Sequence, residues 1–443
     1  MTDLDLILQP SKRTLLKLSL LDSDYSVLQE VQGNLSSLGL SISGDSEIRR
    51  VSNISMVVAA TDQISEGYFG MWMDRMIWMS YGIVDNVTHE TRWWLLGSFL
   101  FSTSNYVINV SSRQISISLV DMMAAATAER GTQIGYGILY PMDSRIEDAL
   151  AATVARFSPY KKYDICEFED VVPYDIEPSR GSYPIDAMRA LVELFPWYEQ
   201  YYSRDGVYTV RRIPTTMSEP VVMTADDMDK IIIGESGDVT YGDIKNCSEV
   251  WGKEINANYT AKSCISESGV YKLVIHDTYK VYESGSLIAF EPDSNCGSGQ
   301  LLYVDGLPEY PIIVEAGDGE RRPIQAEELL AGVMYVVKYI DESFLLQGEA
   351  LIHVMHMEYN KMPSDDVIEG IKAFHGCNDV HFTIEPDSPF ACDRIGIVKQ
   401  VLADGDYSNI YTTELAHERA EYENWKSTRL QEQLSIEALF VPW

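Results

Sequence analysis

The chain has 443 residues, of which 46% are hydrophobic and 23% charged, a balance typical of folded protein. This length suits about three domains of roughly 100–200 residues each. The 67 acidic and 34 basic residues give a formal net charge of -33, which argues against nucleic-acid binding because phosphate contacts require clustered Lys and Arg. Such a surface suits a protein that DNA passes without adhering, although high charge also serves solubility alone.

Six cysteines are spread widely along the chain without a CxxC pair: Cys166, Cys247, Cys264, Cys296, Cys377 and Cys392. This spacing lacks a disulfide framework and indicates free thiols in a reducing compartment. The N-terminus MTDLDLILQPSKR has no apolar core of the signal-peptide type, and no apolar run has the length of a membrane span. We therefore expect a protein made in a bacterial cytoplasm, without stable membrane insertion.

Residues 1–125 are predicted to form a β domain. Apolar residues alternate with other residues in successive stretches that include Leu16, Leu18 and Leu20, then Leu38, Leu40 and Ile42, then Ile54, Met56 and Val58, and then Ile115, Ile117 and Leu119. Alternation with period two gives each strand one buried face, and several such strands favour a barrel or a sandwich. Trp and Met gather at residues 71–79 and 93–94, a pattern more typical of core than of a subunit contact.

Residues 126–225 are predicted to form a small α+β domain. Ser144 and Glu147 have the spacing of a capping box before a helix over residues 146–157. Pro184 suits the first turn of a second helix. The pair Asp205-Gly206 lies between an aromatic run and an apolar strand, which predicts a hairpin.

The last unit is predicted to combine residues 226–256 with 351–443, interrupted at 257–350 by an inserted β module with glycine-rich turns. An insertion requires its two ends to lie close together. A helix is expected from Ser364 to His375, with Gly376 as its C-cap. A strand over 380–384 and another in the 390s should follow.

A long amphipathic helix is predicted from Thr413 to Leu434. Apolar and aromatic side chains fall on about half of its surface, and charged residues cover the rest. We interpret the apolar half as a face buried against a partner. The candidate interface residues are Tyr411, Leu415, Tyr422, Trp425, Leu430 and the terminal Trp443.

A search for catalytic chemistry finds little in the sequence. His353 and His356 have HxxH spacing, and His375, Cys377 and His381 follow. A strand would turn residues three apart to opposite faces, so this set is not expected to bind a metal. HExxH, GxSxG, P-loop and GxGxxG motifs do not occur. We therefore predict no catalytic residue, no cofactor and no metal ligand.

Several motifs in combination resemble the tail-hub family of tailed bacteriophages and phage-like particles. They are GLSI at 39–42, WWLLG at 93–97, RDGVYTVRRIP at 204–214, KNCSEVWG at 245–252, DSPFACDRIG at 387–396 and ELAHERAEYENWKSTRL at 414–430. The resemblance covers most of the chain outside residues 257–350. That segment resembles, more weakly, small β modules of phage tail fibres and tips.

The resemblance implies an α+β, predominantly β fold with two tube-type antiparallel barrels, in residues 1–125 and in the unit 226–256 plus 351–443. It implies a virion protein that forms a homotrimer, caps the tail tube and contacts the distal-tail ring, the tape-measure protein and tip or fibre proteins. DNA would be passing cargo only. The alternatives are a tail-associated cell-wall hydrolase, or a glycan-binding protein that acts through residues 257–350.

Overall fold

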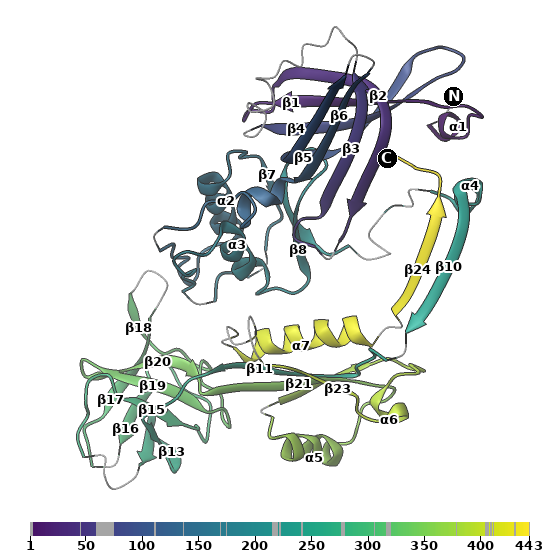
Figure 1. Ribbon diagram of the computed structural model, residues 1–443. Helices are drawn as coiled ribbons and strands as arrows, with labels where there is room; N and C mark the ends of the chain where they lie inside the picture. Colours follow the sequence, from purple (N-terminus) through teal and green to yellow (C-terminus); the bar gives the residue numbers. More distant parts are fainter. Residues whose placement is uncertain are drawn as a thin grey trace.

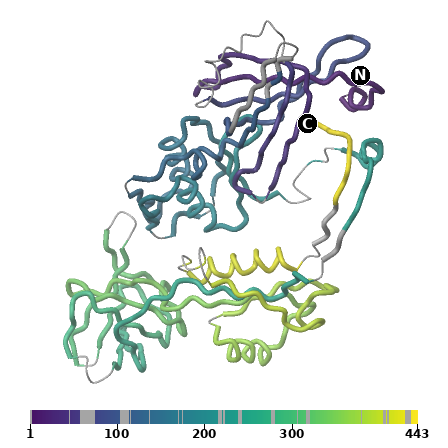
Figure 2. Tube along the Cα trace, in the orientation of Figure 1, coloured from purple at the N-terminus to yellow at the C-terminus, as the bar shows by residue number. Residues whose placement is uncertain are grey.

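The computed structural model places most of the chain in two bodies joined by a two-stranded ribbon (Figures 1 and 2). The residues that the structure describes are 3–44, 46–58, 75–109, 112–135, 137–168, 170–173, 175–214, 220, 223–240, 242–275, 280–304, 306–315, 320–377, 379–403, 407, 410, 412–428 and 431–442. The predicted class, α+β and mostly β, is confirmed.

The first body is built on a closed barrel with strand order β1-β2-β3-β6-β5-β4 and antiparallel pairing throughout. The strands are β1 Arg13–Leu21, β2 Val27–Ile42, β3 Arg50–Val58, β4 Met76–Val84, β5 Thr91–Asn109 and β6 Ser112–Asp121, preceded by the short helix α1 Asp3–Ile7. The period-two pattern of the sequence supplies the buried interior, in which Leu16, Leu18, Met79 and Phe99 are fully buried. Closure also removes free sheet edges. Of the Trp and Met cluster, residues 71–74 lie outside the described residues.

A small α+β unit packs against one end of the barrel (Figure 1). It comprises a 3₁₀ helix Met122–Ala126, α2 Ile146–Phe157, β7 Tyr163–Ile165, α3 Pro184–Val192, β8 Tyr198–Tyr202 and β9 Tyr208–Arg212. The predicted hairpin is confirmed, with Gly206 at the positive φ that its turn requires. The predicted capping box is wrong: α2 begins after Arg145, and the Ser144 hydroxyl donates instead to the Pro141 carbonyl.

The second body contains a four-stranded sheet of order β22-β21-β11-β23. Its elements are β11 Cys247–Glu254, β21 Leu351–Tyr359, α5 Asp365–His375, β22 Asp379–Ile384, α6 Cys392–Ile395, β23 Lys399–Leu402 and α7 Thr413–Ser427. This open mixed sheet stands where a second barrel was expected. Helix α5 links β21 to β22, and such a crossover makes neighbouring strands parallel. The strand expected in the 390s is instead the turn of helix α6 followed by β23.

The segment 257–350 forms a separate sheet, of order β12-β15-β19-β20-β17-β16-β14-β13 with β18 on β17. The strands are β12 Tyr259–Thr260, β13 Ser263–Glu267, β14 Val270–Val274, β15 Leu287–Phe290, β16 Leu301–Val304, β17 Tyr310–Glu315, β18 Arg321–Pro323, β19 Tyr335–Ile340 and β20 Ser343–Glu349. Its core is its own, and includes Tyr271, Phe290 and Phe344. Glu254 pairs with Leu351, so the two ends meet as an insertion requires.

The ribbon between the bodies pairs β10 Ile232–Thr240, which follows α4 Ala225–Ile231, with β24 Gln431–Ala438. The C-terminal helix therefore ends at Ser427 and not at Leu434, because distant pairing with β10 converts its last predicted turns into a strand. Beyond β24, Leu439 and Val441 pack on the barrel core, and the Phe440 ring meets Tyr81 edge-on at 5.0 Å. None of the helices described is long and apolar enough to cross a bilayer.

Candidate functional site

The predicted interface residues on α7 make contacts within the chain. The rings of Tyr422 and Trp425 lie 5.2 and 5.4 Å from that of Trp197, which precedes β8 in the first body. Leu415 packs against the core of the first body. Tyr411, Leu430 and Trp443 lie outside the described residues. The structure thus brings three of the six candidates to the junction between the bodies.

The opposite side of α7 lies on the sheet. Ala416 and Ala420 are fully buried against Val250 and Val354. Small side chains let the helix approach the strands closely, so α7 is sandwiched between its own sheet and the first body. Thr412 caps the helix by accepting a hydrogen bond from the Leu415 amide.

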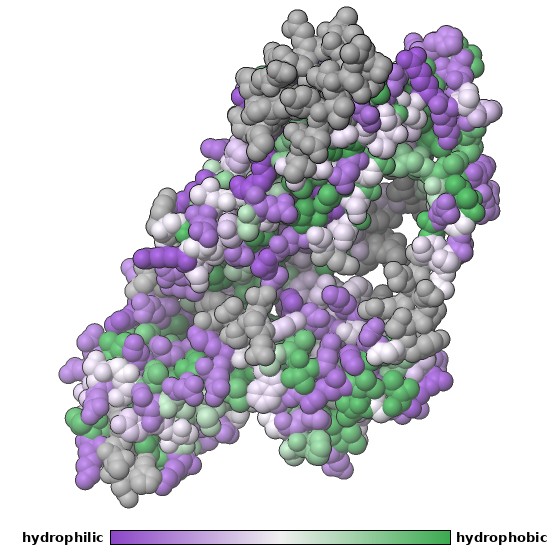
Figure 3. Space-filling view, in the orientation of Figure 1, coloured by the Kyte–Doolittle hydropathy of each residue, from purple (hydrophilic) through white to green (hydrophobic). Residues whose placement is uncertain are grey.

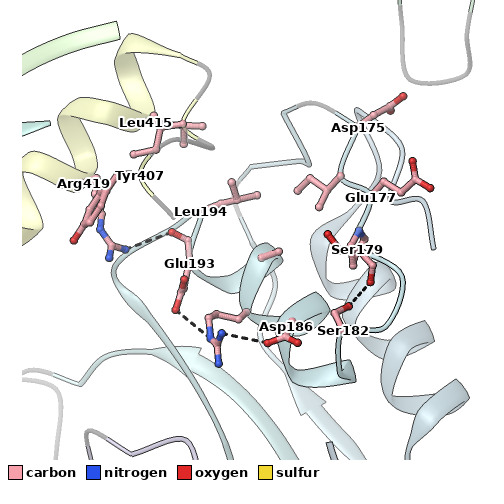
Figure 4. A pocket seen from close by; sticks show the side chains of 15 residues that line it. Asp175, Glu177, Ser179, Ser182, Asp186, Glu193, Leu194, Tyr407, Leu415 and Arg419 are labelled. Carbon is pink, nitrogen blue, oxygen red and sulfur yellow. Dashed lines mark hydrogen bonds and ion pairs between the residues drawn. The ribbon is translucent and has the colours of Figure 1, made fainter. Parts of the chain in front are cut away.

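A cleft of about 540 Å³ lies beside this junction (Figure 4). Residues around α3 form one wall, and Tyr407, Leu415 and Arg419 form the other. Arg419 donates to the Glu193 carbonyl across the cleft at 3.5 Å. Burial lowers the pKa of Arg419, but Tyr407 and Glu423 more than offset this effect, so the guanidinium stays charged.

The α3 wall is acidic, and its arginine pairs with two of its carboxylates. Arg189 lies 3.4 Å from Asp186 and 3.7 Å from Glu193. The lining residues that the structure describes include no histidine or cysteine, the usual partners of an activated nucleophile. The geometry is that of a polar contact between two bodies.

Several exposed apolar side chains lie in one stretch of the second body, around α5, α6 and β23. Between residues 362 and 401 they are Met362, Val367, Phe374, Ile384, Ile395, Ile397 and Val401. Phe374 is 84% exposed, and it lies two helical turns from Val367 on α5. Figure 3 shows apolar atoms at the lower right of the view, where Figure 1 draws α5 and α6. We refer to these seven residues as the α5–α6 apolar face.

His353 and His356 point to opposite faces of the sheet, as residues three apart on a strand do. His353 points to the α5 side of the sheet, where its Nε2 lies 2.6 Å from Glu249 and its ring stacks on Trp251 at 3.6 Å. Burial raises the pKa of Glu249, but hydrogen bonds from Lys399 and His353 outweigh it and lower the pKa overall. His356, on the α7 side, instead contacts Thr383. The HxxH pair therefore does not form one site.

Sequence reasoning missed a different cluster, Asp379, His381 and His417, whose possible ligand atoms all lie within 4.8 Å of one another. Asp379 and His381 are two apart on β22 and share a face, but His417 comes from α7. Only the packing of α7 on the sheet brings these residues together, and no spacing in the sequence signals it.

The comparisons with known proteins are limited in extent. Residues 387–443 match a family model described as a domain of unknown function, DUF5048. No curated protein matches the chain.

Among solved structures, a tail protein from Neisseria meningitidis has 10% identity and a TM-score of 0.35, over 54% of this chain and 64% of that one. A 43 kDa tail protein of prophage MuSo2 from Shewanella oneidensis has 10% identity and a TM-score of 0.35, over 76% and 97%. The lidded Francisella PdpA-VgrG complex has 8% identity and a TM-score of 0.38, over 74% and 43%. The chain thus spans less than two thirds of the first two structures' lengths (Neisseria and Francisella). Scores of this size do not establish a shared fold.

Proposed function

We propose that the protein is a non-enzymatic structural subunit, a tail-tip or baseplate hub of a phage or phage-like particle, that assembles as a homotrimer. The observation that carries the proposal is the α5–α6 apolar face. It lies on the unit that contains the DSPFACDRIG motif, the strongest part of the resemblance to tail hubs.

A second copy of this chain is the occupant that we assign to the apolar face. Soluble monomers rarely expose large contiguous apolar patches, and interface cores are depleted in charge and enriched in aromatic residues. Phe374, 84% exposed, would be the aromatic anchor of such a contact. Because each chain carries a net charge of -33, association has to overcome mutual repulsion. Burial of apolar surface would supply the driving force.

In the proposed assembly, three chains surround a conduit for DNA and the tape-measure protein, and the ring abuts the tail tube and the distal-tail protein. Acidic side chains on the wall would repel the DNA phosphates, so DNA would slide through as cargo. Tip or fibre proteins would attach outside, with residues 257–350 as one candidate contact.

The first test is the native mass of the purified chain by light scattering at about 0.15 M salt, where screening acts over about 8 Å. One chain has a mass of 50.0 kDa. A species of three times this mass supports the proposal. A clean monomer that also fails to join purified tail tubes contradicts it.

The apolar face is tested with the substitution Phe374→Asp. The side chain is 84% exposed, so the folded monomer should tolerate the change while the trimer dissociates. Val87→Asp is the matched control, because Val87 is 81% exposed on a turn of the first body. Equal loss of trimer in both variants would point to added charge alone.

A further inference from the structure

A group of histidines and one carboxylate gathers between helix α7 and the sheet of the second body. His356 of β21 and His381 of β22 are partners in parallel register, and so they lie side by side on one face. Asp379 lies on the same face because it is two residues from His381. His417 projects from α7 onto this group.

Three of these residues bring possible ligand atoms within 4.8 Å of one another. Nε2 of His381 and Nε2 of His417 each lie 3.4 Å from Oδ2 of Asp379. The two imidazole rings stack face to face, with centroids 3.5 Å apart and an interplanar angle of 7°. The other carboxylate oxygen, Oδ1, is held by Lys372 at 3.2 Å, which leaves Oδ2 directed at the histidines.

The His417 side chain is buried, and its ring nitrogens form no hydrogen bonds with the described residues. The residue is only 7% exposed. In the part of the chain that the structure describes, Nε2 has only the Asp379 carboxylate nearby, at 3.4 Å, which forms an ion pair when the imidazole is protonated, and Nδ1 has no hydrogen-bond partner. Buried polar atoms without partners are uncommon because each costs free energy. A buried imidazole without a hydrogen-bond partner, beside a carboxylate and a second imidazole, is therefore a candidate ligand group.

We propose that Asp379, His381 and His417 bind a first-row divalent transition ion, with zinc as the expected occupant. Two imidazoles and one carboxylate are ligands that such an ion prefers. Bonds of about 2.0–2.2 Å require the three donors to converge slightly. The side chain of His381 is 54% exposed, so its ring can leave the stack and turn Nε2 toward the ion. The same opening lets water complete the coordination.

Bound there, the ion fastens α7 to β22. The metal would join Asp379 and His381 of β22 to His417 of α7. This adds a fixed link to a helix that otherwise packs on the sheet through small side chains such as Ala416 and Ala420. The inference rests on this cluster alone and is independent of the proposed assembly.

The experiment is zinc titration of the metal-stripped full chain by calorimetry at pH 7.5, with Co²⁺ absorption as a report on coordination. We expect one ion per chain and a higher Tm with zinc. His381→Asn and Asp379→Asn alter partly exposed side chains and should fold, yet each should weaken zinc binding by about tenfold or more. Circular dichroism checks that both variants are folded.

The matched control is His89→Asn, which removes an exposed histidine in the first body. His89 has a φ of 60°, a conformation that asparagine also adopts readily, so zinc affinity and Tm should equal those of the parent. Failure of the parent to bind zinc overturns the proposal. So does zinc binding that survives unchanged in both His381→Asn and Asp379→Asn.

Discussion

Asn246 provides the sharpest test of how the second body is held together. Its side chain is completely buried and forms three hydrogen bonds with the segment that contains α6. Nδ2 donates to the carbonyls of Phe390 and Gly396, both at 2.8 Å, and Oδ1 accepts from the Val398 amide at 2.7 Å. One amide group thereby fixes the backbone between α6 and β23.

The substitution Asn246→Ala removes all three bonds and leaves two carbonyls and one amide without partners. A buried hydrogen bond contributes about 1 to 1.5 kcal/mol net, and stranded groups cost somewhat more. We therefore expect a loss of about 3–4.5 kcal/mol, a large share of the roughly 5–15 kcal/mol that stabilises a typical domain. Asn246→Asp should not rescue it, because a carboxylate oxygen would face the Phe390 and Gly396 carbonyls.

The assay is native-state hydrogen exchange at the Gly396 amide, which donates to the Cys392 carbonyl and so keeps its acceptor in the variant. This amide reports the segment separately from the rest of a multidomain chain. A loss of about 3 kcal/mol corresponds to exchange faster by roughly a hundredfold. Asn258→Ala is the control, since Asn258 makes an exposed side-chain bond to the Leu287 amide at 2.9 Å. The reasoning is refuted if the Gly396 amide exchanges at the parental rate in a folded Asn246→Ala protein.

Three further predictions concern the junction, the module and the barrel. A double-mutant cycle of Trp197→Ala and Trp425→Ala should show a coupling of about 0.5–1.5 kcal/mol in denaturant unfolding, whereas additive effects would mean that the rings do not meet in solution. Residues 257–350 expressed alone should unfold cooperatively, because their core is self-contained; a chain without a thermal transition contradicts this. Burial raises the pKa of Asp121 to about 6, above its value of about 3.9 in unfolded chains, so its contribution to stability falls as pH rises between these values. The Asp121→Asn protein should not lose stability over this pH range, and its amide oxygen can still cap the 3₁₀ helix. If the unfolding midpoint depends on pH in the same way in the parent and the variant, Asp121 does not have the raised pKa.

Local patterns predicted the elements whose form is set by nearby residues. The alternation in β1 and β3 marks the barrel interior, Pro184 starts α3, and Gly376 ends α5 in the left-handed conformation that glycine favours. These features depend on backbone geometry within a few residues.

Features set by distant pairing could not be predicted in this way. The sequence predicts a helix where β24 lies, because these residues continue the helical pattern of α7. They form a strand because they pair with β10, which lies some 190 residues earlier in the chain. The 390s form helix α6 and a short connection to β23, and the distant Asn246 side chain bonds to the backbone on both sides of α6. The assignment of α7 residues to a partner remains a prediction, while three of them contact the first body of the same chain.

The ribbon has a consequence for the order in which the molecule forms. During synthesis β10 emerges about 190 residues before β24, which at roughly 5–20 residues per second leaves its edge unpaired for about 10–40 seconds. An unpaired strand is a template for pairing with other chains. Residues 431–438 cover that edge, and Phe440 just beyond them packs against Tyr81 on the barrel. Until β24 is made and pairs with β10, the nascent chain therefore exposes a strand edge that can pair with other chains.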